Sequence, residues 1–84
     1  MRMTREQMLE KVESIFRDIF DEDELTVVDS TNSDDIEDWD SLNHINLVTS
    51  IERAFEIKFT LEELTNLADV GAMVDLMIRK ISHQ

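Results

Sequence analysis

Residues 39–55 read WDSLNHINLVTSIERAF and mark the point where an acidic loop gives way to a helix. Apolar residues recur through this stretch at helical spacing, and the spacing predicts a helix over residues 41–55 with a buried stripe along it. The stripe is expected to contain Leu42, Ile45, Val48, Ile51 and Phe55. Ser41 then lies in the first turn, where its hydroxyl can face solvent. Backbone N–H groups in a first turn lack intrahelical acceptors, and the helix dipole favours an anion such as a phosphate.

The tripeptide Asp40-Ser41-Leu42 allows two interpretations. Ser41 could anchor a phosphorylated group, or the Asp-Ser pair could simply cap the helix, since both residue types are preferred at helix N-caps. On the tripeptide alone the cap is favoured, because helix caps vastly outnumber modified serines.

The segment before this helix, residues 21–40, contains ten Asp or Glu and no Lys or Arg. Structureless loops of this length are uncommon in small domains, and those that occur tend to be functional or disordered. Apolar residues scattered along it are expected to pin the loop to the rest of the molecule. These are Leu25, Val27, Val28, Ile36 and Trp39.

Three further helices are predicted from capping signals and periodicity. Thr4 and Gln7 form a capping box for a helix over residues 5–20, and Thr60 and Glu63 form another for a short helix. Asp69 is the expected cap of the last helix. The apolar stripe of the first helix contains Met8, Leu9, Val12, Ile15, Phe16, Ile19 and Phe20. The short helix contains Leu61, Leu64 and Leu67. The stripe of the last helix contains Val70, Met73, Val74, Met77, Ile78 and Ile81.

The expected fold class is therefore all-α. Proline is absent and glycine occurs once, which suits a helical bundle better than a sheet protein with turn glycines. The four helices form a small bundle of three longer helices and one short one, with a long loop after the first helix. A length of 84 residues predicts a single domain over residues 1–84.

Charge and composition narrow the functional classes. A formal net charge of −12 disfavours binding to nucleic acid or anionic lipid and favours basic partner surfaces. The absence of cysteine excludes disulfides, thiolate zinc sites and a thiol nucleophile. No signal segment or run of transmembrane length is recognised, so we expect a cytoplasmic protein without membrane insertion. We also expect the protein to be a monomer.

Two catalytic or metal-binding alternatives fit the sequence poorly. An EF-hand loop beginning at Asp29 would have Asp34 in place of the turn glycine and Asp40 in place of the closing glutamate. A hydrolytic triad of Ser41, His44 and Asp40 would lack an oxyanion hole and a nucleophile elbow. No catalytic residue and no metal ligand is therefore predicted.

Other residues with functional potential have ordinary interpretations. His44 is expected to be a polar helix residue, and His83 a solvated residue of the tail. Met8, Met73 and Met77 are expected to fill the core rather than form a partner groove. Trp39 is expected to anchor the loop rather than to stand exposed as a recognition aromatic.

Taken over nearly its full length, the pattern resembles the acyl carrier protein family, including its peptidyl carrier relatives. Residues 39–47, WDSLNHINL, are similar to the modification site of specialised members, and residues 51–59, IERAFEIKF, to the segment that follows it. In this setting the interpretation of Ser41 as an anchor outweighs the cap.

The resemblance implies a carrier and not an enzyme. A separate phosphopantetheinyl transferase would attach 4′-phosphopantetheine to Ser41, with Asp40 positioning the serine or the transferase's metal ion. The arm would hold acyl or aminoacyl groups as thioesters and pass them between loading, transferring or condensing enzymes with basic docking patches. The resemblance places partner contacts at Leu42, Asn46, Glu52 and Arg53.

Departures from the family pattern bear on the pathway. Arg53 stands where fatty-acid carriers usually have an acidic residue, and Asn43 and Asn46 are neutral. Residues 37–39 replace a glycine commonly found before the motif. A dedicated polyketide, secondary-metabolite or surface-polysaccharide pathway is therefore favoured over general fatty-acid synthesis.

Three questions stay open at this point. The chain could instead be a divalent-ion-binding helical sensor or an unmodified helical interaction module. The cargo and its loading enzyme are not specified by the sequence. The bundle interior could shelter an acyl chain or be an ordinary packed core; its lining would include Val48, Ile51, Leu64 and Met73.

Overall fold

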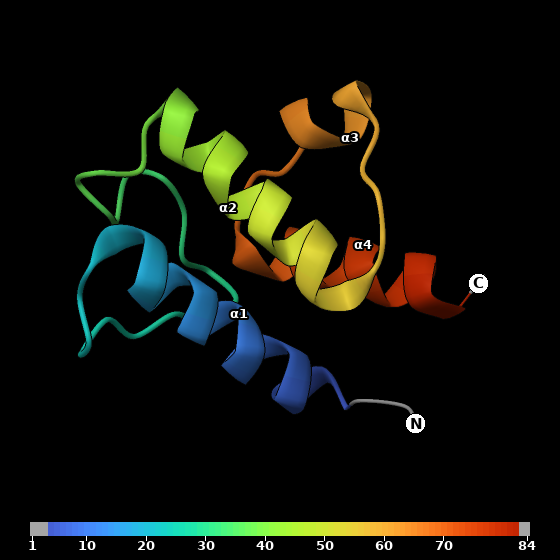
Figure 1. Cartoon of the computed structure of the whole chain (residues 1–84), viewed down its shortest axis with the longest axis horizontal. Helices are drawn as coiled ribbons and strands as arrows, with labels where there is room; N and C mark the ends of the chain where they lie inside the picture. The colour runs from blue at the N-terminus through green and yellow to red at the C-terminus, as the bar shows by residue number, and fades with distance from the viewer. Residues whose placement is uncertain (1–3, 83–84) are drawn as a thin grey trace.

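A computed structural model describes residues 4–82, which form a bundle of four helices (Figure 1). The helices are α1 (Arg5–Phe20), α2 (Ser41–Phe55), α3 (Leu61–Thr65) and α4 (Val70–Ser82). The all-α prediction is confirmed, as are the predicted bounds of α1 and α2. His83 lies outside the described residues. No helix within residues 4–82 combines the length and the apolar character needed to cross a membrane.

The predicted caps set where the helices begin. Thr4 and Gln7 exchange both capping-box hydrogen bonds at α1, and Thr60 and Glu63 do so at α3. The Asp69 carboxylate accepts the Ala72 N–H at 2.8 Å at the start of α4. These bonds satisfy donors that a helix start would otherwise leave without partners.

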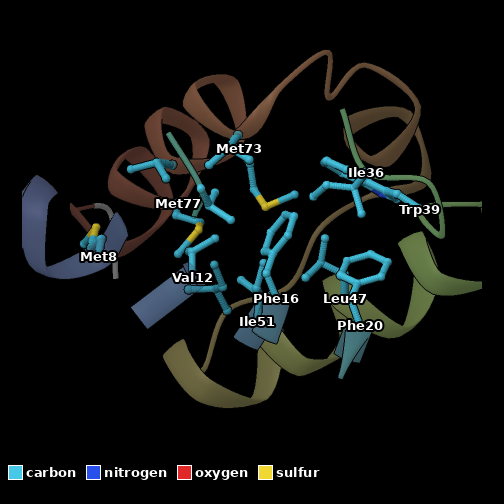
Figure 2. Close-up of a cluster of buried hydrophobic side chains, with 14 residues drawn as sticks. Met8, Val12, Phe16, Phe20, Ile36, Trp39, Leu47, Ile51, Met73 and Met77 are labelled. Carbon is cyan, nitrogen blue, oxygen red and sulfur yellow. The ribbon is translucent and has the colours of Figure 1, made fainter. Parts of the chain in front are cut away.

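The core lies where α1 packs against both α2 and α4. Side chains from these helices and from the long loop converge there (Figure 2). The predicted stripes of α1 and α4 are confirmed, since every member is buried or partly buried. The fully buried large side chains are Val12, Phe16, Leu47, Ile51, Val70, Met73, Val74 and Met77.

The predicted stripe of α2 is wrong at its N-terminal end. Leu42 is 68 % exposed and Ile45 is 57 % exposed, whereas Leu47, which the prediction left out, is fully buried. Val48 and Ile51 are buried as predicted, and Leu47 lies on their side of the helix. Leu42 and Ile45 belong to a second apolar row on another side of α2, and periodicity alone does not tell which row faces the core.

The long loop is ordered as a series of short turns. Four i to i+3 backbone hydrogen bonds close turns at residues 22–25, 28–31, 32–35 and 36–39. Val27, Ile36 and Trp39 are buried and Leu25 is partly buried, as predicted.

Val28 is a wrong prediction, since it is 49 % exposed. Adjacent side chains of an extended segment point to opposite sides, so burial of Val27 turns Val28 outward. The Val27 N–H also donates to the Glu13 carboxylate at 2.9 Å, which holds this part of the loop on α1.

The middle of the loop joins the first turn of α4. The N–H groups of Val70 and Gly71 donate to the carbonyl oxygens of Thr31 and Asp29 at 2.9 and 2.8 Å. Arg5 reinforces the joint, because its guanidinium contacts the carboxylate of Asp29 at 2.7 Å and that of Asp75 at 3.2 Å. The loop backbone thus supplies acceptors for α4 donors that have none within the helix.

We expect Gly71→Ala to destabilise the protein, because Gly71 lies where the loop backbone comes closest to α4. A Cβ at residue 71 would lie 3.0 Å from the carbonyl oxygen of Asp29, which also accepts the Gly71 N–H. Overpacking costs about 1–3 kcal/mol, whereas alanine gains about 1 kcal/mol of helix propensity, so a net loss of about 1 kcal/mol is expected in urea unfolding.

The control for this substitution is Asp21→Gly. Asp21 ends α1 in the left-handed region, with φ of 53°. Glycine adopts this conformation without strain, so Asp21→Gly should leave stability unchanged or raise it. A more stable Gly71→Ala variant would contradict the close approach at Asp29.

Candidate functional site

The start of α2 is held by a buried aromatic anchor. Trp39 is only 9 % exposed, and its ring meets Phe16 of α1 edge-on with centroids 5.1 Å apart. The interpretation of Trp39 as a loop anchor is confirmed. Because Ser41 follows two residues later, the anchor places the first turn of α2 at the rim of the bundle.

Asp40 caps α2, and Ser41 is the first residue of the helix. The Asp40 carboxylate accepts the Asn43 N–H at 2.8 Å. The Asn43 side-chain amide in turn donates to the Asp38 carbonyl oxygen at 2.8 Å. Ser41 is exposed and is not needed as the cap, so its hydroxyl is accessible beside a positive helix end.

A groove of about 640 Å³ opens between the start of α2 and α3. Ser41 and Ile45 line it from α2, and Leu61 and Leu64 line it from α3. The groove accounts for the exposure of Ile45, and for that of Leu61 at 77 %. An exposed hydroxyl at the edge of a largely apolar groove can carry a group whose distal part lies along the groove.

The helix α3 is shorter than its leucines predict. It ends at Thr65, so Leu67 lies outside it, and none of its five residues is buried. With α3 standing away from the core, its leucines face the groove rather than the bundle interior.

His44 does not form a triad with Ser41 and Asp40. Its Nδ1 accepts the indole N–H of Trp39 at 3.1 Å, and its Nε2 lies 3.4 Å from the carbonyl oxygen of Leu64. Both ring nitrogens are therefore engaged away from Ser41. The i, i+5 spacing of Trp39 and His44 was the available sequence signal for this contact, and it was not recognised.

The residues proposed for partner contacts lie in different environments. Leu42, Asn46 and Arg53 are exposed on α2. Glu52 is half-buried, and its carboxylate accepts the Phe59 N–H at 2.8 Å. Glu52 therefore also fixes the segment that leads from α2 to α3, a role that charge patterning did not reveal.

The acidic loop uses its side chains within the fold. Asp29 pairs with Arg5, and Asp35 accepts the Asn32 N–H at 3.0 Å. Between residues 4 and 82, no group of three or more His, Cys, Asp or Glu is arranged to hold a metal ion.

Lys80 of α4 holds α3 from the other side. Its Nζ lies 2.7 Å from the Glu63 carboxylate and 5.6 Å from the centroid of the Phe59 ring. The hydrogen bond from Lys80, followed by that from the Thr60 N–H, lowers the pKa of Glu63 below its usual value of 4.5.

Comparisons with known proteins agree with this geometry. Residues 10–77 match the family model described as a phosphopantetheine attachment site. An acyl carrier protein from Petrotoga mobilis is 35 % identical over 82 residues, which cover 95 % of this chain and 94 % of that protein. The solution NMR structure of a holo acyl carrier protein from Geobacter metallireducens superposes with a TM-score of 0.83 at 41 % identity, covering 89 % of this chain and 86 % of that one.

We expect the Glu63–Lys80 pair to stabilise the protein at neutral pH and not in acid. Because the folded pKa of Glu63 is lowered, its contribution is complete above the unfolded pKa and is lost as the pH falls through the folded value. Glu63→Gln retains the capping box, since glutamine also serves at that position. This variant should melt below the unmutated protein at neutral pH, and the difference should be smaller at about pH 3.

Circular dichroism melts at both pH values measure this difference, with Glu62→Gln as the control. Glu62 is an exposed carboxylate in the same turn of α3, so its replacement should matter less. A Glu63→Gln deficit that persists unchanged in acid would contradict the assignment to the charged pair.

Proposed function

The chain belongs to the acyl carrier protein family, whose members carry a phosphopantetheine group and are not enzymes, and from this premise we propose that Ser41 is the attachment residue. The observation that carries the proposal is the exposed Ser41 hydroxyl at the first residue of α2, on the edge of the groove. The group supplies a thiol that bears acyl or aminoacyl cargo as a thioester. Since the chain has no cysteine, no thiol of its own would compete.

The residues beside Ser41 suit a phosphodiester. The N–H groups of the first turn and the α2 dipole favour its negative charge, whereas the Asp40 carboxylate already accepts the Asn43 N–H. We propose that Asp40 orients Ser41 towards a phosphopantetheinyl transferase by fixing the first turn, and that Leu42 supplies an apolar contact beside it.

The groove, rather than the bundle interior, suits the arm and its cargo. Val48, Ile51 and Met73 are buried and packed in the core. Leu64 lines the groove instead, together with the exposed Ile45 and Leu61. We propose that these three side chains shelter the apolar part of a loaded arm.

Partner enzymes that load, transfer or condense acyl groups would approach the exposed side of α2. The net charge of −12 favours basic docking patches on these enzymes, which Glu52 would meet, and Leu42, Asn46 and Arg53 would complete the contact surface. Arg53 reverses the charge sign within this otherwise neutral or acidic surface. Such a reversal favours partner enzymes that are dedicated to this carrier. We therefore propose that the protein works in a polyketide, secondary-metabolite or surface-polysaccharide pathway.

Residues 1–84 would act as one carrier domain, as a monomer in the cytoplasm. The exposed groove and α2 surface are then free to meet one partner after another.

We expect Ser41 alone to accept the prosthetic group. Incubation with coenzyme A and a broad-specificity phosphopantetheinyl transferase should add one phosphopantetheine mass to the protein, and Ser41→Ala should add none. Ser33→Ala is the matched control, since Ser33 is an exposed serine on the same groove and its loss should leave the modification intact. An unmodified parent protein would favour the helical interaction module, and modification of Ser41→Ala would exclude Ser41 as the site.

We expect Leu42→Ala to weaken transferase recognition without weakening the fold. Leu42 is 68 % exposed, so its truncation should change the free energy of unfolding by no more than about 0.5 kcal/mol. The loss of an apolar contact in the complex should lower kcat/KM for modification about tenfold. Thr49→Ala, an exposed substitution on the same helix, is the control, and equal rates for both variants would remove Leu42 from the docking surface.

A further inference from the structure

A chain of hydrogen bonds crosses from the core to α3 through His44. The Trp39 indole N–H donates to His44 Nδ1 at 3.1 Å, and the two rings are stacked with centroids 6.0 Å apart. His44 Nε2 lies 3.4 Å from the Leu64 carbonyl oxygen. One imidazole therefore links the buried anchor of the loop to α3.

The chemistry of these partners determines the tautomer of the ring. An indole N–H only donates, so His44 Nδ1 must accept and carry no proton. The proton of the neutral ring is then on Nε2, which donates to the Leu64 carbonyl. The two hydrogen bonds thus run in one direction, because Trp39 donates to His44 and His44 donates to Leu64.

The helix α3 has few other attachments. None of its residues is buried, and it is only five residues long. Lys80 holds Glu63 from the α4 side, and the Glu52–Phe59 bond lies before the helix begins. His44 holds α3 from the α2 side, across the groove that Ser41 borders.

We propose that His44 is a positioning residue, which braces α3 against the start of α2 and so sets the shape of the groove beside Ser41. The link to an arm in that groove rests on the proposed function; the brace itself is a property of the unmodified chain. A leucine of similar size would leave the Trp39 N–H and the Leu64 carbonyl without their partner. Glutamine can replace both bonds, because its side chain has one acceptor and one donor group.

The tautomer gives the first test. Long-range ¹H–¹⁵N spectra of the unmodified protein should show a protonated Nε2 and an unprotonated Nδ1 for His44, because the Trp39 indole can only donate to Nδ1. Trp39→Phe retains an aromatic ring against Phe16 but deletes the indole donor, so the fixed tautomer should be lost. A protonated Nδ1 in the unmutated protein would overturn the proposal.

Amide hydrogen exchange gives the second test, in which His44→Gln should restore the protection of α3 that His44→Leu loses. In His44→Leu, exchange of the α3 amides should accelerate about fivefold, as expected for loss of a hydrogen-bonded link worth about 1 kcal/mol. In His44→Gln it should stay close to the parent rate, and α1 amides should keep their protection in both variants. Equal α3 exchange in the leucine and glutamine variants, or in leucine and parent, would overturn the brace.

Measurements on the protein with an acylated arm test whether the His44 brace affects the groove. An octanoyl thioester on the arm should be cleaved by hydroxylamine about tenfold faster in His44→Leu than in the parent or in His44→Gln, because an unbraced α3 shelters it less. Equal cleavage in all three would remove the groove from the proposal. Failure of the proposed function would appear separately, as an absent phosphopantetheine mass in the parent, while the tautomer and exchange results would still decide the brace.

Discussion

The burial of Trp39 against Phe16 is the contact on which the rest of this structure depends. It ends a long acidic loop inside the core and fixes where α2 begins. Two residues later the chain has reached the surface, so Ser41 is exposed because Trp39 is buried. The same indole also extends a hydrogen bond to His44 and through it towards α3. One side chain thereby links the hydrophobic core to both walls of the groove.

The acidic loop is held by three kinds of contact, and charge attraction is only one of them. Its apolar residues are buried in the core, its backbone forms hydrogen bonds with α4 and with Glu13 of α1, and Arg5 bridges Asp29 and Asp75. The excess negative charge is left at the surface, where it repels nucleic acid and attracts basic proteins. A carrier that must meet several enzymes in turn can use this long-range attraction with each of them.

Much of the fold could be predicted because its signals are local. Capping boxes at Thr4 and Thr60 and the periodic stripes of α1 and α4 depend on residues a few positions apart. The errors at Leu42, Ile45 and Val28 concern direction, since an apolar residue at the right spacing can face solvent or a groove as well as a core. Ser41 is predicted from its motif, whereas the Trp39–His44–Leu64 link requires the tertiary approach of α3 to α2.

The series of four turns in the long loop has a consequence for how this chain folds. Each turn closes over four residues, so much of the connection between α1 and α2 can become ordered through local contacts. The chain entropy that remains to be lost when Thr31 and Asp29 dock on α4 is correspondingly smaller. Since the sequence contains no proline, no slow peptide-bond isomerisation interrupts this assembly. A loop of unusual length therefore need not make folding slow.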